Sequence, residues 1–189
     1  MTLTLQQLAF FPWWAFLIYW IVSASRLKQV KTEEAPNDRL LHIGIMVVAF
    51  CFLFRTDFGF GILDTRFVAF APGIQYAGVA LTWLGVAFAI WARYSIGANW
   101  SGRVTLKVDH QLIQSGPYAF VRHPIYSGLL VANAGAALFI GKWRCVAALA
   151  IFLVEMSRKA LKEEKLMVSE FGEQYGEYRR HTGFLVPRF

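Results

Sequence analysis

The chain has 189 residues, of which 57% are hydrophobic and 16% charged, and its formal net charge is +7. Together with a mean hydropathy of +0.44, this composition excludes an ordinary soluble domain and indicates several membrane-spanning helices. The positive charge does not indicate nucleic-acid binding, because the basic residues flank apolar segments, as membrane topology and anionic lipid headgroups require. We therefore expect an all-α, polytopic membrane protein that binds no nucleic acid.

The first three apolar segments predict membrane helices. Residues 8–24 carry aromatic anchors for the membrane interface. Residues 40–54 are short against the ~20 residues of a full crossing and would extend into their polar flanks. Residues 74–92, which end before Arg93, carry small residues that let helices approach closely in lipid. These small residues are Gly73, Ala77, Gly78, Ala80 and Gly85.

Two further apolar segments, residues 125–140 and 145–156, are joined by a tight link at residues 141–144. Such a short connection predicts an antiparallel helical hairpin. Beyond the hairpin, the charged residues 158–171 are expected to form a tail helix. In total we expect about five transmembrane helices.

The isolated histidine and the cysteines carry little functional signal. His42 lies inside the second segment, and we interpret it as a packing or interface residue rather than a ligand. Cys51 and Cys145 both fall inside apolar segments, so neither a disulfide framework nor a metal site is expected. The N-terminus lacks the basic region and small-residue cleavage site of a signal peptide.

The distribution of basic residues predicts the orientation in the membrane. With five spans, fifteen Lys and Arg residues fall on one side and four on the other. The positive-inside rule then places the N-terminus outside and the C-terminus in the cytoplasm, and we expect the cell inner membrane. We divide the chain into residues 1–98, with the first three spans, and residues 99–189, with a polar loop, the hairpin and the tail.

The polar loop holds an unusual stretch, residues 110–128, which reads HQLIQSGPYAFVRHPIYSG. Pro117 and Pro124 bend its backbone. Arg122 and His123 precede an apolar run, so they should lie at a helix start, where free N–H groups suit an anionic ligand group. The alternative is that both residues only anchor this helix at the lipid headgroups.

A second polar cluster follows the hairpin. If the last helix continues beyond Met156, Glu163 and Glu164 lie about two turns further on, near the headgroups. The alternative is a solvated tail helix with pairs of opposite charge, such as Lys159 and Glu163.

The two clusters together resemble a known family. The pattern G-P-Y-x-x-V-R-H-P-x-Y-x-G is preceded by H-x-L-I and followed by a helical hairpin, an E-E pair, F-G-x-x-Y-x-x-Y and a closing Pro. This combination resembles the isoprenylcysteine carboxyl methyltransferase family, to which phospholipid N-methyltransferases and bacterial thiol methyltransferases look related. The resemblance covers residues 99–187, almost half of the chain.

The resemblance implies a membrane enzyme that uses S-adenosylmethionine without a soluble Rossmann-type domain. In this family the cofactor lies in a cytosolic pocket formed by the loop and the tail helix, so residues 99–189 would be the methyltransferase region. Arg103 stands where a family member places a further cofactor contact. The residues implied to line the pocket are His110, Gln111, Leu112, Ile113, Tyr118, His123, Pro124, Ile125, Tyr126 and Glu163.

These residue types suit methyl transfer from a sulfonium, in which an enzyme mainly positions and desolvates the reactants. Glu163 can accept hydrogen bonds from ribose hydroxyls or pair with the amino group. His123 and the helix-start N–H groups can hold the methionine carboxylate. Tyr118 and Tyr126 can cover the adenine or the sulfonium.

The acceptor is expected to be a lipophilic or small molecule at the membrane. The family places an arginine four residues before the first glutamate of the pair; here that residue is Lys159, with Arg158 beside it. These two are the candidate catalytic cations for a carboxylate acceptor. Because lysine lacks the bidentate fork of arginine, a prenylcysteine carboxylate, a phospholipid and a small thiol all stay open as acceptors. The sequence does not predict the oligomeric state.

Two other functions stay open at this point. Sterol and steroid reductases share part of the C-terminal architecture and use NADPH, and a non-enzymatic membrane protein could keep the scaffold. Equilibrium binding of S-adenosylmethionine and of NADPH discriminates between the three hypotheses.

Overall fold

The computed structural model describes residues 3–24, 30–32, 36–55, 59–97, 100, 106–107 and 111–188. Most of the described chain is helical, as the sequence predicts. The α-helices are α1 (Leu5–Ala24), α2 (Pro36–Phe54), α3 (Pro72–Ile96), α4 (Pro124–Ile140), α5 (Trp143–Phe171) and α6 (Glu173–His181). The short elements are the 3₁₀ helices η1 (Gly61–Asp64) and η3 (Gly116–Ala119) and the antiparallel strands β1 (Val30–Thr32) and β2 (Leu106–Lys107).

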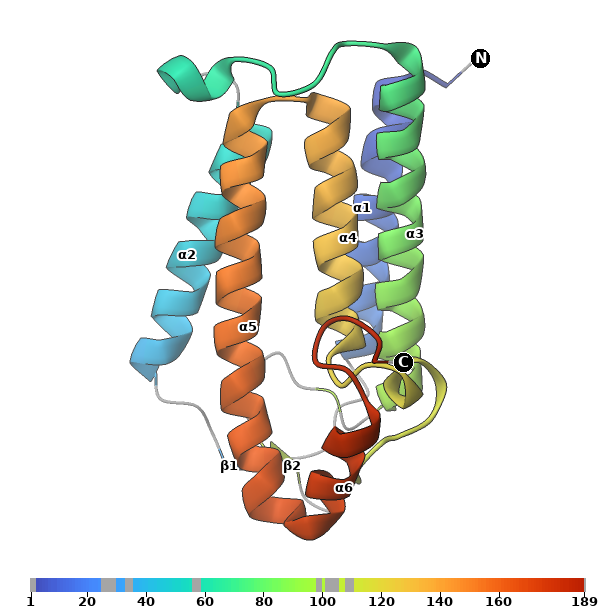
Figure 1. The fold of residues 1–189 in the computed structure, drawn as a ribbon, viewed down its shortest axis with the longest axis vertical. Coiled ribbons are helices and arrows are strands. Elements are labelled where there is room, and N and C mark those ends of the chain that lie inside the picture. The colour runs from blue at the N-terminus through green and yellow to red at the C-terminus, as the bar shows by residue number, and fades with distance from the viewer. Residues whose placement is uncertain are drawn as a thin grey trace.

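The long helices α1 to α5 run alternately up and down along the molecule (Figure 1). Helix α2 packs on α5, α4 packs on both α5 and α3, and α1 packs on α3. Each of the five predicted apolar segments lies within one of these helices, and the predicted hairpin is α4 with α5. Of the described helices, α1 and α3 are long and apolar enough to cross a membrane, so a count of five crossings stays a prediction.

The helices extend beyond the apolar segments that predicted them, most clearly α2, α3 and α5. Helix α2 begins at Pro36, four residues before its apolar run, because proline is well suited to the first turn. Helix α3 continues past Arg93 to Ile96. Helix α5 has 29 residues, about 43 Å at the usual rise, and passes from the hairpin through the predicted tail helix without a break.

Close contact between α3 and α4 depends on residues without bulky side chains. A Cβ added at Gly85 would lie 2.3 Å from the backbone nitrogen of Ala132, and one at Gly128 would lie 2.7 Å from that of Ala89. Gly78 lies in the same contact, as predicted. The other predicted small residues, Gly73, Ala77 and Ala80, are exposed.

At the α4–α5 link, a buried arginine connects the start of α5 to the end of α2 and to η1. The Arg144 side chain is 1% exposed and donates hydrogen bonds to the carbonyls of Phe52 (2.6 Å) and Leu53 (2.9 Å), at the end of α2. Its Nε also lies 3.1 Å from Asp64 in η1. Arg144 therefore satisfies carbonyl groups that the end of a helix leaves without partners.

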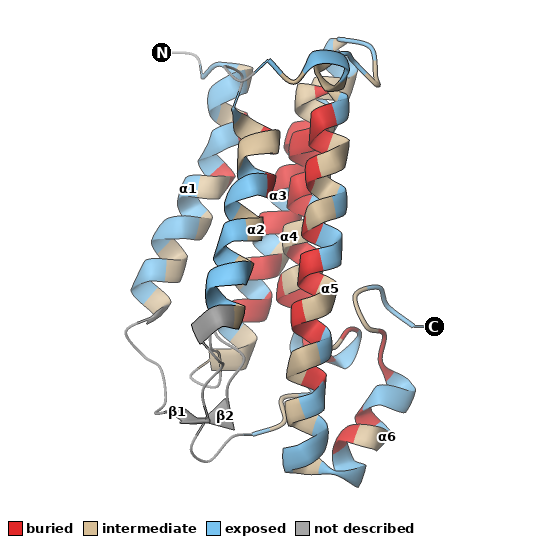
Figure 2. Ribbon diagram, turned by 90° about the vertical axis from the view of Figure 1, so that its left-hand side faces the viewer, coloured by how far each residue is buried: buried red, intermediate tan, exposed pale blue. Residues whose placement is uncertain are grey.

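Apolar side chains cover the outer faces of α1 and α2, which are mostly pale blue in Figure 2. Ile21 is 66% exposed and Leu40 is 67% exposed. Buried residues concentrate in α3, α4 and α5. An apolar outer surface of this extent suits contact with lipid.

Candidate functional site

The two polar clusters of the sequence meet at one end of the bundle. The start of α4, the last turns of α5, α6 and the C-terminal tail converge there, at the bottom of Figure 1. The structure thus brings together side chains of the loop and of the tail helix, which the resemblance implies form one pocket.

The C-terminal tail runs beside the R-H-P motif and holds its backbone. The Arg122 N–H donates to the Gly183 carbonyl (2.9 Å), and the Gly183 N–H donates to the Phe120 carbonyl (3.0 Å). The Ser127 hydroxyl donates to the carbonyl of Leu185 (2.6 Å). Sequence reasoning missed this role of the tail, because pairing between segments about sixty residues apart leaves no local pattern.

His123 lies between the two glutamates of α5. Its side chain is 8% exposed, with Nδ1 3.6 Å from Glu163 Oε2 and Nε2 3.4 Å from Glu164 Oε1. The ring stacks on Tyr126, with ring centroids 5.7 Å apart, and the Tyr126 hydroxyl donates to Glu163 Oε1 at 2.5 Å. Burial by itself would lower the pKa of His123, but hydrogen bonds with both glutamates raise it. The site therefore favours a charged imidazolium.

Glu164 is occupied by protein cations. Its Oε1 accepts from Arg122 Nε at 2.6 Å, and its Oε2 lies 3.5 Å from Arg179 Nε. Burial by itself would raise the pKa of Glu164, but hydrogen bonds from His123 and Arg122 hold it at about 2. The Glu164 side chain is 6% exposed and that of Glu163 is 23% exposed. Of the two carboxylates, Glu163 is thus the more accessible to a ligand.

An apolar wall stands beside these charges. Tyr118 and Ile125 are buried together with Ala92, and Ile113 packs against them. The Tyr178 hydroxyl donates to the Tyr118 carbonyl at 2.7 Å. Burial raises the pKa of the Tyr118 hydroxyl, which stays protonated.

The remaining predicted cofactor residues fall in different surroundings. Pro124 is buried in the first turn of α4. Leu112 is half-buried and Gln111 is exposed. His110 and Arg103 lie outside the described residues.

The two candidate catalytic cations lie on different sides of α5. Lys159 is 8% exposed and lies one helical turn before Glu163, on the same face. Arg158 instead makes two hydrogen bonds to Glu155 (2.8 and 2.7 Å), and the same carboxylate lies 2.6 Å from His42 of α2. Arg158 therefore lies in the contact between α2 and α5, whereas Lys159 lies on the Glu163 side of α5.

Arg93 is a buried cation that sequence reasoning treated only as the end of a span. It is 2% exposed, donates to the carbonyls of Gly97 (2.8 Å) and Ser23 (2.9 Å), and lies 4.5 Å from the ring centroid of Trp100. Within the described part of the chain, its buried Nε has no hydrogen-bond partner. An arginine after an apolar run looks like a headgroup anchor, so the sequence carries no signal for this burial.

Comparison with known proteins agrees with this arrangement. Residues 78–169 match the model of the isoprenylcysteine carboxyl methyltransferase family. The matched residues make up just under half of the chain. The family region includes Arg93, His123 and Glu163, whereas α6 and the tail lie beyond it.

Individual relatives of this family are similar over parts of their length. The protein-S-isoprenylcysteine O-methyltransferase of Schizosaccharomyces pombe is 32% identical over 80 residues, which cover 42% of this chain and 34% of the relative. That of Tribolium castaneum is 29% identical over 128 residues, covering 62% of this chain and 45% of the relative. The human enzyme is 28% identical over 117 residues, covering 60% and 41%. The chain thus spans less than half of each of these three relatives.

The fold resembles a solved structure of the family. The eukaryotic intramembrane Ras methyltransferase ICMT superposes with a TM-score of 0.57 at 22% identity, covering 83% of this chain and 54% of that one. The likeness shows that the fold is similar over most of this chain.

Proposed function

We propose that the protein is an integral membrane methyltransferase that uses S-adenosylmethionine and acts on a lipophilic acceptor. The observation that carries this proposal is the cluster of His123, Glu163 and Tyr126 at one end of an apolar bundle, inside the region that matches the family. The relatives are named for methylation of isoprenylcysteine, so a prenylcysteine carboxylate is the acceptor class that we propose first.

The residues present fit S-adenosylmethionine, which when bound supplies an electrophilic methyl group on a sulfonium. Glu163 offers an accessible carboxylate for ribose hydroxyls or an amino group. His123 offers a cation for the methionine carboxylate, and the ring of Tyr126 offers an aromatic face for a positive centre. Tyr118 and Ile125 exclude water from one side.

A carboxylate acceptor would make few chemical demands on this chain. Such a group is ionised at neutral pH, so its oxygen is nucleophilic without a general base. The chain has to position that oxygen and keep water away. Lys159, on the Glu163 face of α5, and Arg93, with a buried Nε, are the cations that we propose for holding the acceptor carboxylate.

The test is equilibrium binding to the detergent-solubilised protein. We expect saturable binding of S-adenosylmethionine and none of NADPH. The reverse result would support a reductase on a related scaffold. Binding of neither ligand would support a non-enzymatic membrane protein and would overturn the proposal.

A further inference from the structure

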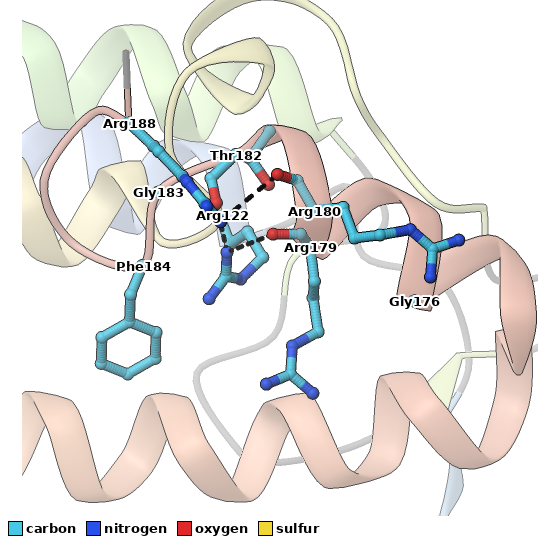
Figure 3. A pocket seen from close by; sticks show the side chains of 8 residues that line it. All are labelled: Arg122, Gly176, Arg179, Arg180, Thr182, Gly183, Phe184 and Arg188. Carbon is cyan, nitrogen blue, oxygen red and sulfur yellow. Dashed lines mark hydrogen bonds between the residues drawn. The ribbon is translucent and has the colours of Figure 1, made fainter.

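A pocket of about 490 Å³ opens between the start of α4, α6 and the C-terminal tail (Figure 3). This volume lies within the ~300–1,000 Å³ of small-molecule sites. The lining residues are Arg122, Gly176, Arg179, Arg180, Thr182, Gly183, Phe184 and Arg188. Four of these eight residues are arginines, a concentration of charge that methyl transfer does not use.

The positive charges of Arg122, Arg179 and Arg188 are only partly balanced by neighbouring carboxylates. Arg122 and Arg179 share one carboxylate, Glu164, which also contacts His123. Arg188 donates a long hydrogen bond of 3.4 Å to the Arg180 carbonyl, and no carboxylate of the described residues lies within ion-pair distance of it. Among the described residues, the guanidinium groups of Arg122, Arg179 and Arg188 are thus balanced by one carboxylate, that of Glu164.

The fourth arginine differs from the other three. Arg180 pairs with Glu173 and Glu177 of its own helix. In Figure 3 its guanidinium points away from those of Arg122 and Arg179. Its charge is already balanced, and it provides a natural comparison for the others.

The chain holds the central arginine in place. Arg122 donates from Nη1 to the carbonyls of Thr182 (2.5 Å) and Arg179 (3.4 Å), and from Nε to Glu164. Its guanidinium is thereby oriented before any ligand arrives, which lowers the entropic cost of binding. A planar guanidinium matches the oxygens of a phosphate group, and several together offset its charge of about −1.5 to −2 when it is a monoester.

We propose that Arg122, Arg179 and Arg188 bind a phosphate group, carried either by an anionic membrane lipid or by a soluble phosphate compound. The pocket borders the start of α4, an apolar helix, so a lipid headgroup is within reach. Glu164 lies between this pocket and Glu163, with Oε1 toward His123 and Oε2 toward Arg179. The phosphate site is thus separate from the proposed methyl-transfer site and does not depend on that function.

The experiment measures calorimetric binding to the full chain in a neutral detergent. The probes are phosphatidylglycerol, phosphatidylcholine as the zwitterionic comparison, and inorganic phosphate. The test variant combines Arg179→Gln with Arg188→Gln. The control variants are Arg180→Gln, in the same pocket, and Lys165→Gln, an exposed cation of α5.

We expect the double variant to lose at least tenfold in affinity and the controls to stay within twofold. Loss for phosphatidylglycerol alone identifies a lipid headgroup, and loss for inorganic phosphate identifies a soluble ligand. If the double variant does not fold, Arg188→Gln alone should fold, because among the described residues the Arg188 side chain makes one long hydrogen bond, to the Arg180 carbonyl. This single variant should lose about threefold in affinity. Two results would overturn the proposal. One is a folded test variant whose affinity for phosphatidylglycerol and for inorganic phosphate is unchanged. The other is a wild type that does not prefer phosphatidylglycerol to phosphatidylcholine and does not bind inorganic phosphate.

Discussion

Neighbouring residues on α5 lie in different surroundings, because consecutive side chains on a helix point about 100° apart. Glu164 faces Arg122 and His123 and is nearly inaccessible, whereas Glu163 retains exposed surface. In the same way, Lys159 lies on the Glu163 face while Arg158 contacts Glu155. Substitutions of adjacent residues should therefore fail for different reasons.

His123→Ala and Glu163→Ala are each expected to weaken S-adenosylmethionine binding by about 1–3 kcal/mol, the scale of losing a charged hydrogen bond. Isothermal titration calorimetry measures the change, and Lys165→Ala serves as the control because Lys165 is exposed on the same helix. Unchanged affinity in both site variants would refute the assignment of these residues to the cofactor.

Glu164→Gln is expected to destabilise the protein by about 3 kcal/mol, because it leaves buried cations without their carboxylate. The pH dependence follows from the depressed pKa of Glu164: its stabilising contribution is present above about pH 4.5 and is lost as the pH falls towards about 2. The pKa of His123 is raised, so the stability that its charged form contributes is kept at low pH and is lost only as the pH rises through this raised pKa. Thermal unfolding in detergent from pH 6 to pH 2 should fall less steeply for Glu164→Gln than for the wild type. Parallel curves would contradict this account.

Lys159→Ala is expected to lower turnover while leaving S-adenosylmethionine affinity nearly intact. Arg158→Ala is the matched comparison: it should lower the thermal stability, because Arg158 contacts Glu155, and leave turnover per folded molecule close to that of the wild type. Steady-state kinetics with prenylcysteine, phospholipid and small-thiol acceptors measures both. If Lys159→Ala leaves turnover of every acceptor unchanged, the acceptor cation lies elsewhere, with Arg93 as the next candidate.

At the scale of elements, α3 and α4 form the closest pair of helices. Gly78, Thr82, Gly85 and Ala89 follow one another at spacings of three and four residues, so they share one face of α3. The Thr82 hydroxyl donates to the Gly78 carbonyl at 2.9 Å and so has a partner inside the contact. This contact positions the start of α4, and hence His123, relative to Arg93.

Gly85→Ala is expected to destabilise the protein by about 1–3 kcal/mol, because the new Cβ would clash with the backbone of α4. Moving α3 and α4 apart would relieve the clash but would lose packing between them. Gly73→Ala, near the start of the same helix, has no atom within 4 Å of its new Cβ. That control should be neutral or slightly stabilising, since alanine favours helix more than glycine does. Unfolding in a denaturing detergent series compares the two, and equal losses would disprove this view of the contact.

At the scale of the whole molecule, the alternation of α1 to α5 places the N-terminus at the end opposite to the candidate site (Figure 1). If all five helices cross the bilayer, fifteen Lys and Arg residues lie on the side of the candidate site and four on the other side. The positive-inside rule predicts that this end is cytoplasmic, where a polar methyl donor would be available. We therefore propose that a lipophilic acceptor reaches the site from the bilayer and the donor from the cytoplasm.

Cysteine-accessibility labelling tests this orientation. In a variant without the free cysteines Cys51 and Cys145, Lys165→Cys should react with a membrane-impermeant reagent only after the membrane is opened. Thr4→Cys should react in intact cells. Labelling of Lys165→Cys from outside would contradict both the topology and the proposed entry of the donor.

Local patterns of residues predicted the helical elements, the hairpin and the residues of the two polar clusters. Apolar runs, turn residues at Gly116 and Pro117, and the R-H-P and E-E motifs are local signals, readable without knowledge of the packing. The resemblance that these motifs carry also implied that the loop and the tail helix form one pocket.

Which of these side chains are accessible to a ligand depends on how the helices pack. The rotation of α5 about its axis separates Glu163 from Glu164 and Lys159 from Arg158. The burial of Arg93 beside Trp100 and the pairing of Arg122 with Gly183 join residues that are distant along the chain. Such contacts depend on how whole helices and the tail pack together, and a local pattern of residue types does not contain that information.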